Sequence, residues 1–257
     1  MKIVVTGAGS GIGRAACLRL QRDVLARTGV GARIVVVDRV ADRIDSVCAE
    51  LRAEGAEPSG FQGDLSTIET CEALMRFVSE RLGGLDLLVN NAGQGRRGAL
   101  EALATQDWDE VFALVARAPW LLSKLAFPML QAAGGTIVNV ASMSGIQPQP
   151  GLGPYSSAKA ALVMLTRQMA IEWAPKGIRV NAVSPGFIHT ARVDWIYQDE
   201  RRKADRIAAI PQGRIGAPED IANVIAFLAG PDAAYMQGEN VVVDGAFSLA
   251  AMCRVAH

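Results

Sequence analysis

A β-branched run that leads straight into a glycine-rich turn opens the chain and limits the folds available to it. The run Lys2 to Thr6 is followed by Gly7-Ala8-Gly9-Ser10-Gly11-Ile12-Gly13 and then by an amphipathic helical pattern. In such a strand–turn–helix unit, Gly7 permits the tight turn, Gly11 lets the main chain approach a pyrophosphate, and Gly13 lets the helix pack closely on the strand. The helix N-terminus then presents free N–H groups to the phosphates. The motif predicts a dinucleotide site, and a merely flexible loop is the alternative.

Strand-like and helix-like patterns alternate along the rest of the chain. Short apolar runs are expected as strands at 2–6, 33–37, 58–62, 86–89, 136–140, 178–183 and 240–243, with helices at 41–54, 66–82, 106–130 and 153–173. This alternation predicts an α/β protein with a doubly wound (Rossmann) parallel sheet of about seven strands and helices on both faces. Its 257 residues show no repeat or linker, which favours a single domain over residues 1–257.

Composition argues against several classes of protein. Lys plus Arg and Asp plus Glu both number 26, and this zero net charge is unlike a general nucleic-acid or membrane-surface binder. We expect no apolar run long enough to span a bilayer, and the N-terminus lacks a signal-peptide layout. Four scattered cysteines and two histidines do not suggest a metal site. These features predict a cytoplasmic protein with reduced thiols that binds neither nucleic acid nor membrane.

An acidic residue at the end of the second expected strand bears on the choice of cofactor. Asp38 stands where a carboxylate accepts both hydroxyls of an adenosine ribose and repels a 2′-phosphate. NAD is therefore favoured over NADP. NADP stays open, because Arg14 or Arg39 could pair with a phosphate.

A tyrosine and a lysine lie four positions apart in the helical pattern from Gly153 to Trp173. At that spacing Tyr155 and Lys159 share one face. A free tyrosine titrates near about 10, and a nearby ammonium group favours the phenolate and lowers that pKa. Tyr155 could then exchange a proton with an alcohol or a carbonyl. Ser142, at the end of the fifth expected strand, would bring a hydroxyl to the same crevice. Taken alone, the pair is more often an ordinary helix with an exposed lysine.

Together these motifs resemble the classical short-chain dehydrogenase/reductase family over essentially the whole chain. The resemblance rests on Thr6-Gly7-x-x-x-Gly11-x-Gly13, Asn90-Asn91-Ala92-Gly93, Ser142, Tyr155-x-x-x-Lys159, Asn181, and Pro185-Gly186 with Thr190. It implies an NAD(H)-dependent oxidoreductase that interconverts a secondary alcohol and a ketone, with a small-molecule substrate and a homotetrameric assembly.

The resemblance also implies residue roles. Tyr155 would be the general acid/base, Ser142 would hydrogen-bond the reacting oxygen, and Lys159 would lower the tyrosine pKa and bind the nicotinamide ribose. Cofactor contacts are implied for Gly7, Ser10, Gly11, Ile12, Gly13, Asp38, Asp64, Leu65, Asn91, Ala92, Gly93, Tyr155, Lys159, Pro185, Gly186, Ile188 and Thr190. Substrate contacts are implied for Gln94, Met143, Gly145, Gln147, Phe187 and a lid-like segment, Arg192 to Tyr197, that includes Trp195. No metal is implied.

Arginines near this expected pocket raise the question of an acidic substrate. Arg96, Arg97 and Arg192 could bind a carboxylate or a sulfonate. Solvated surface arginines are the more common outcome.

The sequence departs from the family pattern at two places. The family's fourth catalytic residue, an asparagine that serves a proton relay, is replaced by Val115, whose side chain can neither donate nor accept. Either an altered relay serves the enzyme, or turnover is slow. The second departure is an insertion within Gln21 to Gly31, expected to lengthen the first helix or its exit loop. Two alternatives remain, an NADP-dependent carbonyl reductase, including the 3-oxoacyl type, and a nucleotide-binding protein with weak catalysis.

Overall fold

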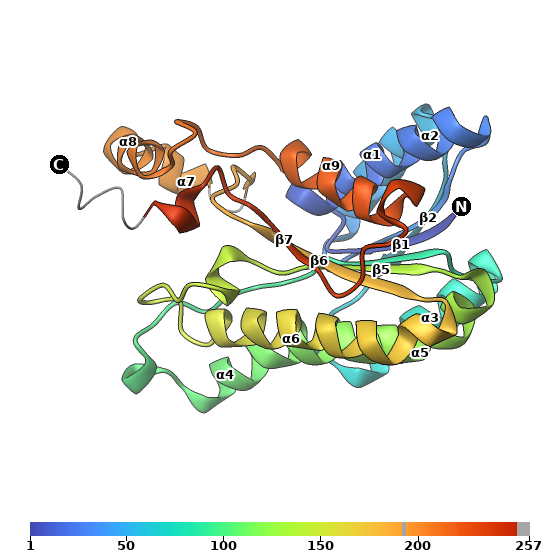
Figure 1. Cartoon of the computed structure of the whole chain (residues 1–257), viewed down its shortest axis with the longest axis horizontal. Helices are drawn as coiled ribbons and strands as arrows, with labels where there is room; N and C mark the ends of the chain where they lie inside the picture. The colour runs from blue at the N-terminus through green and yellow to red at the C-terminus, as the bar shows by residue number, and fades with distance from the viewer. Residues whose placement is uncertain (192–193, 251–257) are drawn as a thin grey trace.

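Seven parallel strands form one sheet in the order β3-β2-β1-β4-β5-β6-β7 (Figure 1). The computed structural model describes residues 1–191 and 194–250. The strands are β1 Lys2–Thr6, β2 Arg33–Asp38, β3 Glu57–Gln62, β4 Leu87–Asn90, β5 Thr136–Val140, β6 Arg179–Pro185 and β7 Asn240–Val243. The strand order reverses between β1 and β4, which is where doubly wound sheets bind their ligands. The predicted fold class is confirmed.

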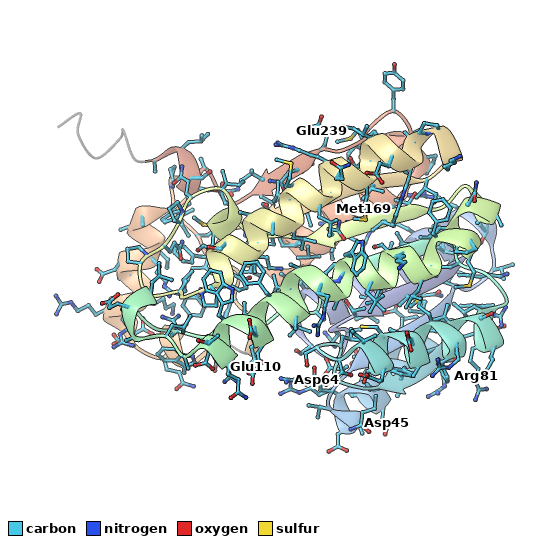
Figure 2. The ribbon with its side chains drawn as sticks, turned by 90° about the horizontal axis from the view of Figure 1, so that it is seen from below. Asp45, Asp64, Arg81, Glu110, Met169 and Glu239 are labelled. Atoms are coloured by element: carbon cyan, nitrogen blue, oxygen red, sulfur yellow. The ribbon has the colours of Figure 1, made fainter. Side chains whose placement is uncertain are left out.

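Helices cover both faces of the sheet. One layer holds α1 Gly11–Thr28, α2 Ala41–Ala53 and α9 Pro218–Ala229, and the other holds α3 Ile68–Leu82, α4 Thr105–Phe112, α5 Ala118–Ala133 and α6 Tyr155–Trp173 (Figure 1). Two short helices, α7 Asp194–Tyr197 and α8 Glu200–Ala209, lie beyond the sheet between β6 and α9. Figure 2 shows the second layer with its side chains, among them Met169 of α6.

The apolar strands supply both cores. In β1, Ile3 and Val5 pack with the layer of α1, α2 and α9. Val4 packs with the layer of α3, α5 and α6. Successive strand residues point to opposite faces, and both faces are covered, so most positions of β1, β2 and β4 are apolar. This explains why these strands read as nearly continuous apolar runs rather than as alternating patterns. The edge strand β3 is partly exposed and mostly polar.

The expected helix over 106–130 is longer and contains an irregular turn. The helical run spans Thr105–Ala133 and includes a π turn, Ala113–Arg117, in which the Ala118 N–H donates to the Ala113 carbonyl. This run is long and apolar enough to cross a membrane by length and composition, so our expectation that no such stretch exists was wrong. Half of its most apolar window is buried within the fold.

Most of the segment 21–31, where we expect an insertion in the first helix or its exit loop, belongs to the first helix. Helix α1 continues to Thr28 and ends at Gly29, whose φ of 70° is left-handed. Gln21, fully buried, donates to the Glu54 carbonyl and accepts from the Ala32 N–H, both at 2.7 Å. The inserted segment therefore ties α1 to the start of β2 and to the end of α2, at the sheet edge opposite the strands' carboxyl ends.

Candidate active site

A cleft of about 580 Å³ opens at the carboxyl ends of the strands. Its walls come from the segments that follow β1, β2, β3, β4, β5 and β6, with further residues from α2, α6, α7 and α8. The cleft is lined by Gly7, Ser10, Gly11, Ile12, Val37, Asp38, Arg39, Arg43, Gly63, Leu65, Asn91, Ala92, Gly93, Gln94, Arg97, Leu114, Val140, Ala141, Ser142, Gln149, Tyr155, Lys159, Pro185, Gly186, Phe187, Ile188, Thr190, Ala191, Tyr197 and Arg206.

The glycine-rich turn forms one wall. Gly7 and Gly11 have φ values of 62° and 52°, which favour glycine. Gly13 does not line the cleft, although a cofactor contact was predicted for it. A Cβ on Gly13 would lie 2.2 Å from the Gly7 carbonyl oxygen. This glycine therefore serves the close packing of α1 on the turn, not the ligand surface.

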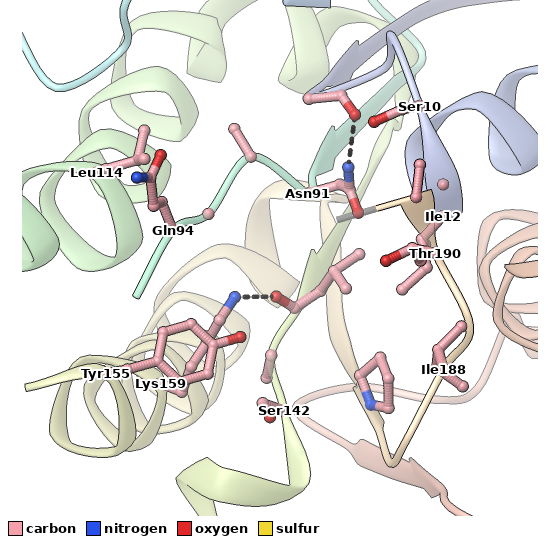
Figure 3. Close-up of a pocket in the computed structure, with 18 of the residues that line it drawn as sticks. Ser10, Ile12, Asn91, Gln94, Leu114, Ser142, Tyr155, Lys159, Ile188 and Thr190 are labelled. Carbon is pink, nitrogen blue, oxygen red and sulfur yellow. Dashed lines mark hydrogen bonds between the residues drawn. The ribbon is translucent and has the colours of Figure 1, made fainter. Parts of the chain in front are cut away.

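The end of β4 holds that turn in place. The Asn91 side-chain amide donates to the Thr6 and Gly7 carbonyls at 2.9 and 3.0 Å. Figure 3 shows Asn91 near Ser10 and Ile12. The Thr6 hydroxyl accepts from the N–H groups of Asn91 and Ala92 at 2.9 and 3.0 Å. Asn91 and Ala92, both predicted to contact the cofactor, therefore fix the geometry of the glycine-rich turn.

Asp38 lies at the carboxyl end of β2 with its carboxylate held by main-chain donors. One oxygen accepts from the Gly9 N–H at 3.0 Å, and the other accepts from the N–H groups of Arg39 and Val40 at 2.8 and 3.1 Å. Asp64, predicted to contact the cofactor, is not part of the cleft wall. Its carboxylate accepts from the Ser66 N–H at 2.9 Å, while its neighbours Gly63 and Leu65 line the cleft.

The basic residues near Asp38 divide into two groups. Arg14 forms an ion pair with Glu50 between α1 and α2 and does not line the cleft. Arg39 does line it, donating to the Gln94 side chain at 2.9 Å and lying 3.8 Å from the Asp64 carboxylate. Arg43 lines it too and was not predicted. It escaped sequence reasoning because only the fold brings the first turn of α2 against the glycine loop.

Ser142, Tyr155 and Lys159 all reach the same cleft (Figure 3). Ser142 follows β5, and its hydroxyl accepts from the Ser144 N–H at 3.1 Å. Tyr155 begins α6, and Lys159 follows one turn later, only 3% exposed. The Lys159 ammonium donates to the Val140 carbonyl at 2.6 Å and lies 5.7 Å from the centre of the Tyr155 ring. A hydroxyl, a phenol and an ammonium group thus converge on one wall.

Val115 is fully buried in the π turn and packs against Val111, Ala158 and Tyr155. The neighbouring Leu114, not Val115, lines the cleft. The position of the family's relay asparagine is therefore occupied by an apolar contact that supports the helix carrying Tyr155.

The substrate end of the cleft differs from the prediction at several positions. Gln94 and Phe187 line it, but Met143 and Gln147 do not. Met143 is buried beneath Gln149, whose amide lies 3.8 Å from its sulfur, and Gln147 donates to the Ser248 carbonyl at 2.6 Å. Gln149 takes the place predicted for Gln147, two residues along the same loop.

Three other residues predicted to contact the substrate are not found among the described residues of the cleft lining. Gly145 packs against α6, since a Cβ there would lie 2.8 Å from the Lys159 main chain. Trp195 is exposed and is not part of the wall. Arg192 lies outside the described residues. Tyr197 of α7, which ends the predicted segment, does line the cleft. Arg206 of α8 lines it too, and no local sequence signal pointed to Arg206.

The cleft is strongly basic, whereas the whole chain is neutral. Its lining contains one carboxylate, Asp38, and five basic side chains, which are Arg39, Arg43, Arg97, Lys159 and Arg206. Such a concentration of one sign of charge favours anionic ligands, of which a dinucleotide pyrophosphate is one. Across residues 1–191 and 194–250, no three His, Cys, Asp or Glu side chains are grouped so that they could hold a metal ion.

Comparison with known sequences identifies relatives along nearly the whole chain. The family model described as enoyl-(acyl carrier protein) reductase matches residues 7–248. Dehydrogenase/reductase SDR family member 4 of Homo sapiens is 35% identical over 244 residues, which cover 94% of this chain and 85% of the relative. Meso-2,3-butanediol dehydrogenase of Serratia marcescens is 36% identical over 243 residues, covering 95% and 92%.

Solved structures agree with this similarity. A protein from Beutenbergia cavernae, described as an NAD(P)-dependent gluconate 5-dehydrogenase with NADP bound at low occupancy, superimposes with a TM-score of 0.88 and 36% identity, covering 97% of this chain and 96% of its own. One from Agrobacterium tumefaciens, described as a 2-deoxy-D-gluconate 3-dehydrogenase with bound NADP, gives a TM-score of 0.85 and 33% identity, covering 95% of each chain.

Proposed function

This chain belongs to the short-chain dehydrogenase/reductase family and is an oxidoreductase that acts on CH–OH groups with NAD(P), and we propose that it interconverts a secondary alcohol and a ketone with Tyr155 as general acid/base. One observation carries this proposal. Ser142, Tyr155 and Lys159 line the same cleft as the glycine-rich turn, although they come from separate elements. The bound nicotinamide would supply or accept the hydride.

The protein's own groups would handle the proton. The Ser142 hydroxyl would hydrogen-bond the reacting oxygen and hold it beside Tyr155. In ketone reduction the Tyr155 hydroxyl would donate its proton to that oxygen, and in alcohol oxidation the phenolate would remove it. The buried Lys159 ammonium, near the tyrosine ring, favours the phenolate.

The relay that replenishes this proton cannot use the side chain of Val115. We assign it to the main chain of the π turn. The Ala118 N–H is bonded to the Ala113 carbonyl, and Pro119 has no N–H. The Leu114 carbonyl thus lacks the donor that position 118 or 119 would supply in a regular helix, and it can accept from solvent instead. Leu114 lines the cleft, which supports an active enzyme with an altered relay over a binding protein.

We further propose that NAD is preferred over NADP. The residues fit a dinucleotide, because the left-handed glycines and the start of α1 offer main-chain N–H groups to its pyrophosphate. The Asp38 carboxylate would repel a 2′-phosphate. Arg39 and Arg43 on the same wall, and relatives with bound NADP, keep NADP as the second candidate.

The relatives' names leave two substrate classes for this site. One relative is named for butanediol, a neutral diol, and the solved structures are named for gluconates, which are polyhydroxy acids. Both classes contain small or medium-sized secondary alcohols, as the proposed reaction requires. The 3-oxoacyl type remains the alternative.

A homotetramer is the assembly we propose. Apolar side chains stand exposed on the layer of α5 and α6, with Trp120, Met164 and Ile171 at 43%, 60% and 77% exposure. Association of subunits would remove this surface from water. Light scattering after size exclusion gives the subunit number directly.

The activity is tested by cofactor turnover with secondary alcohols and ketones, using NAD(H) and NADP(H) in parallel. We expect NAD-linked turnover in the wild type and a loss of about 10²- to 10⁴-fold in kcat for Tyr155→Phe. Cofactor affinity should be kept, because the ring remains. Equal activity in the two proteins would overturn the mechanism, and tight binding without turnover on any substrate would favour the binding-protein alternative.

A further inference from the structure

Within residues 1–191 and 194–250, two arginines that line the cleft lack the carboxylate partner that Arg96, Arg202 and Arg214 have. Arg96 is paired with Asp107 and Glu110, Arg202 with Asp199, and Arg214 with Asp220. Arg97 and Arg206 line the cleft, and no carboxylate of residues 1–191 or 194–250 forms an ion pair with either one. Among the described residues, the fold therefore places two arginines without a carboxylate partner in the lining of the cleft.

Arg206 is held in position by aromatic residues. Its guanidinium carbon lies 4.8 Å from the centre of the Phe187 ring and 5.4 Å from that of Tyr197. One of its nitrogens donates to the Tyr197 hydroxyl at 3.2 Å. Phe187 is itself packed edge-on against Phe247, with ring centres 4.7 Å apart. Because the half-buried guanidinium is already oriented, little conformational entropy is lost when an anion binds to it.

Arg97 approaches the cleft from a different element. It belongs to the loop between β4 and α4, and its guanidinium carbon lies 5.9 Å from the centre of the Trp195 ring. Arg206 comes from α8. Two arginines that stand 206 − 97 = 109 positions apart in the sequence thus line one cleft, together with the uncharged Gln149. A guanidinium presents several N–H donors in a planar fork that matches a carboxylate or a phosphate.

We propose that Arg97 and Arg206 recognise an anionic group on the substrate, a carboxylate or a phosphate ester, so that the enzyme acts on a hydroxy acid or a hydroxyalkyl phosphate rather than on a neutral alcohol. This inference rests on the proposed function, because it names the substrate class of the same cleft. The anion supplies the compensating charge that the described protein residues do not. Arg39 and Arg43, on the Asp38 side, are left to the adenosine end of the cofactor.

Binding provides the first test, and it needs no knowledge of the natural substrate. The wild-type protein with bound NADH is titrated with 3-hydroxybutanoate and with six-carbon aldonic acids, each compared with its primary amide. Phosphate monoesters of the matching alcohols form a third series. Calorimetry reports the affinity in every case. We expect at least one acid or phosphate to bind about tenfold or more tightly than its neutral counterpart, and the two anionic series show which group is preferred.

Substitution of the two arginines is the second test. Arg97→Gln and Arg206→Gln should each lower kcat/KM, or affinity in the NADH complex, by about 10- to 100-fold for the anionic compound. The neutral counterpart should change little. Arg96→Gln and Arg201→Gln are matched controls, because they remove a charge from the same loop and the same helix outside the cleft wall.

These experiments can refute anion recognition by Arg97 and Arg206 without refuting the role of Tyr155 as general acid/base. Amides that bind as tightly as their acids would overturn the substrate class, even if Tyr155→Phe behaves as expected. A rise in the Kd of NADH for Arg97→Gln and Arg206→Gln, with the acid-to-amide ratio unchanged, would also overturn it and assign both arginines to the cofactor. If the acid-to-amide affinity ratio is unchanged in both variants and the Kd of NADH is also unchanged, neither arginine binds the anionic group.

Discussion

The Lys159 ammonium group donates a 2.6 Å hydrogen bond to the main-chain carbonyl of Val140, the last residue of β5. This bond ties the first turns of α6 to β5, the strand that leads into Ser142. It has a consequence for catalysis, because the positions of the Ser142 and Tyr155 hydroxyls relative to one another depend on how α6 sits against β5. Lys159 therefore has a structural task in addition to its proposed electrostatic one.

Replacement of Lys159 by methionine should lower both the stability of the protein and its catalytic rate. The variant leaves a buried carbonyl without its donor, which costs about 1–3 kcal/mol in the free energy of unfolding. It also removes the charge that favours the Tyr155 phenolate, so kcat should fall by about 10²-fold or more. Lys176→Met, at the exposed end of the same helical region, is the control. Urea titrations and steady-state kinetics measure the two effects separately, and a stable variant with full activity would contradict the assignment.

Asp38→Asn should reduce the preference of the protein for NAD over NADP. An amide nitrogen cannot accept the main-chain hydrogen bonds that hold the carboxylate, and the charge that repels a 2′-phosphate is lost. We expect the Kd of NAD to rise by about tenfold and that of NADP to stay level or fall. Asp42→Asn is the matched control. Cofactor titrations followed by fluorescence give both constants, and an unchanged NAD-to-NADP ratio would remove Asp38 from the specificity argument.

Arg43→Ala provides the converse test on the same wall. If Arg43 serves a 2′-phosphate, its removal should weaken NADP by about tenfold and leave NAD unaffected. Arg14→Ala should alter neither affinity, because Arg14 is paired with Glu50 outside the cleft. The same cofactor titrations measure both affinities. If the affinities for NAD and NADP fall equally, Arg43 contacts a part of the cofactor that NAD and NADP share.

Val115→Asn should cost stability without a large gain in rate. The amide would enter an apolar cluster with Val111 and Ala158, so the free energy of unfolding should fall by about 1–3 kcal/mol. If the proton path uses the main chain of the π turn, kcat should change by less than about tenfold. Val115→Thr, of similar shape, is the control. A gain in kcat beyond that limit would support the slow-enzyme alternative instead.

Gly145→Ala should disturb catalysis through packing alone. The added Cβ would lie 2.8 Å from the main-chain carbon of Lys159 and 2.9 Å from the Ala160 nitrogen. Helix α6 must then shift, which costs about 1–3 kcal/mol and misplaces Tyr155 enough to lower kcat by about 10- to 100-fold. Gly151→Ala, in the same loop, has φ of 75° but no atom within 4 Å of its Cβ, so only its backbone is strained. A kcat equal to wild type in Gly145→Ala would refute the role of this contact.

The buried thiol of Cys71 predicts a loss of stability at alkaline pH. Burial raises the pKa of Cys71 from 9.0 to about 11. The raised pKa means that the folded protein favours the neutral thiol. This preference contributes its full stabilisation of the fold below pH 9, and the stabilisation is lost as the pH rises toward 11. Urea unfolding across that range should show a steeper loss for wild type than for Cys71→Ala. Parallel curves for the two proteins would exclude Cys71 as the titrating group.

The sequence by itself determined the architecture of this protein. Local patterns carried that information, since β-branched runs such as Arg33–Val37 and glycines at tight turns act over a few residues. The proposed triad of Ser142, Tyr155 and Lys159 came from the resemblance of the combined motifs to a known family, because the spacing of Tyr155 and Lys159 alone is common. Val115 was likewise visible as an apolar residue where a polar one was expected.

Only the tertiary structure decided which residues share the cleft. Gly13 and Gly145 turned out to be packing positions, Gln149 took the place predicted for Gln147, and Arg43 and Arg206 joined the wall without any motif of their own. The physical reason is that these contacts join elements distant along the chain, as when α8 brings Arg206 against Phe187 and Tyr197. Such proximity arises from how helices and loops pack on the finished sheet, and no local periodicity encodes it.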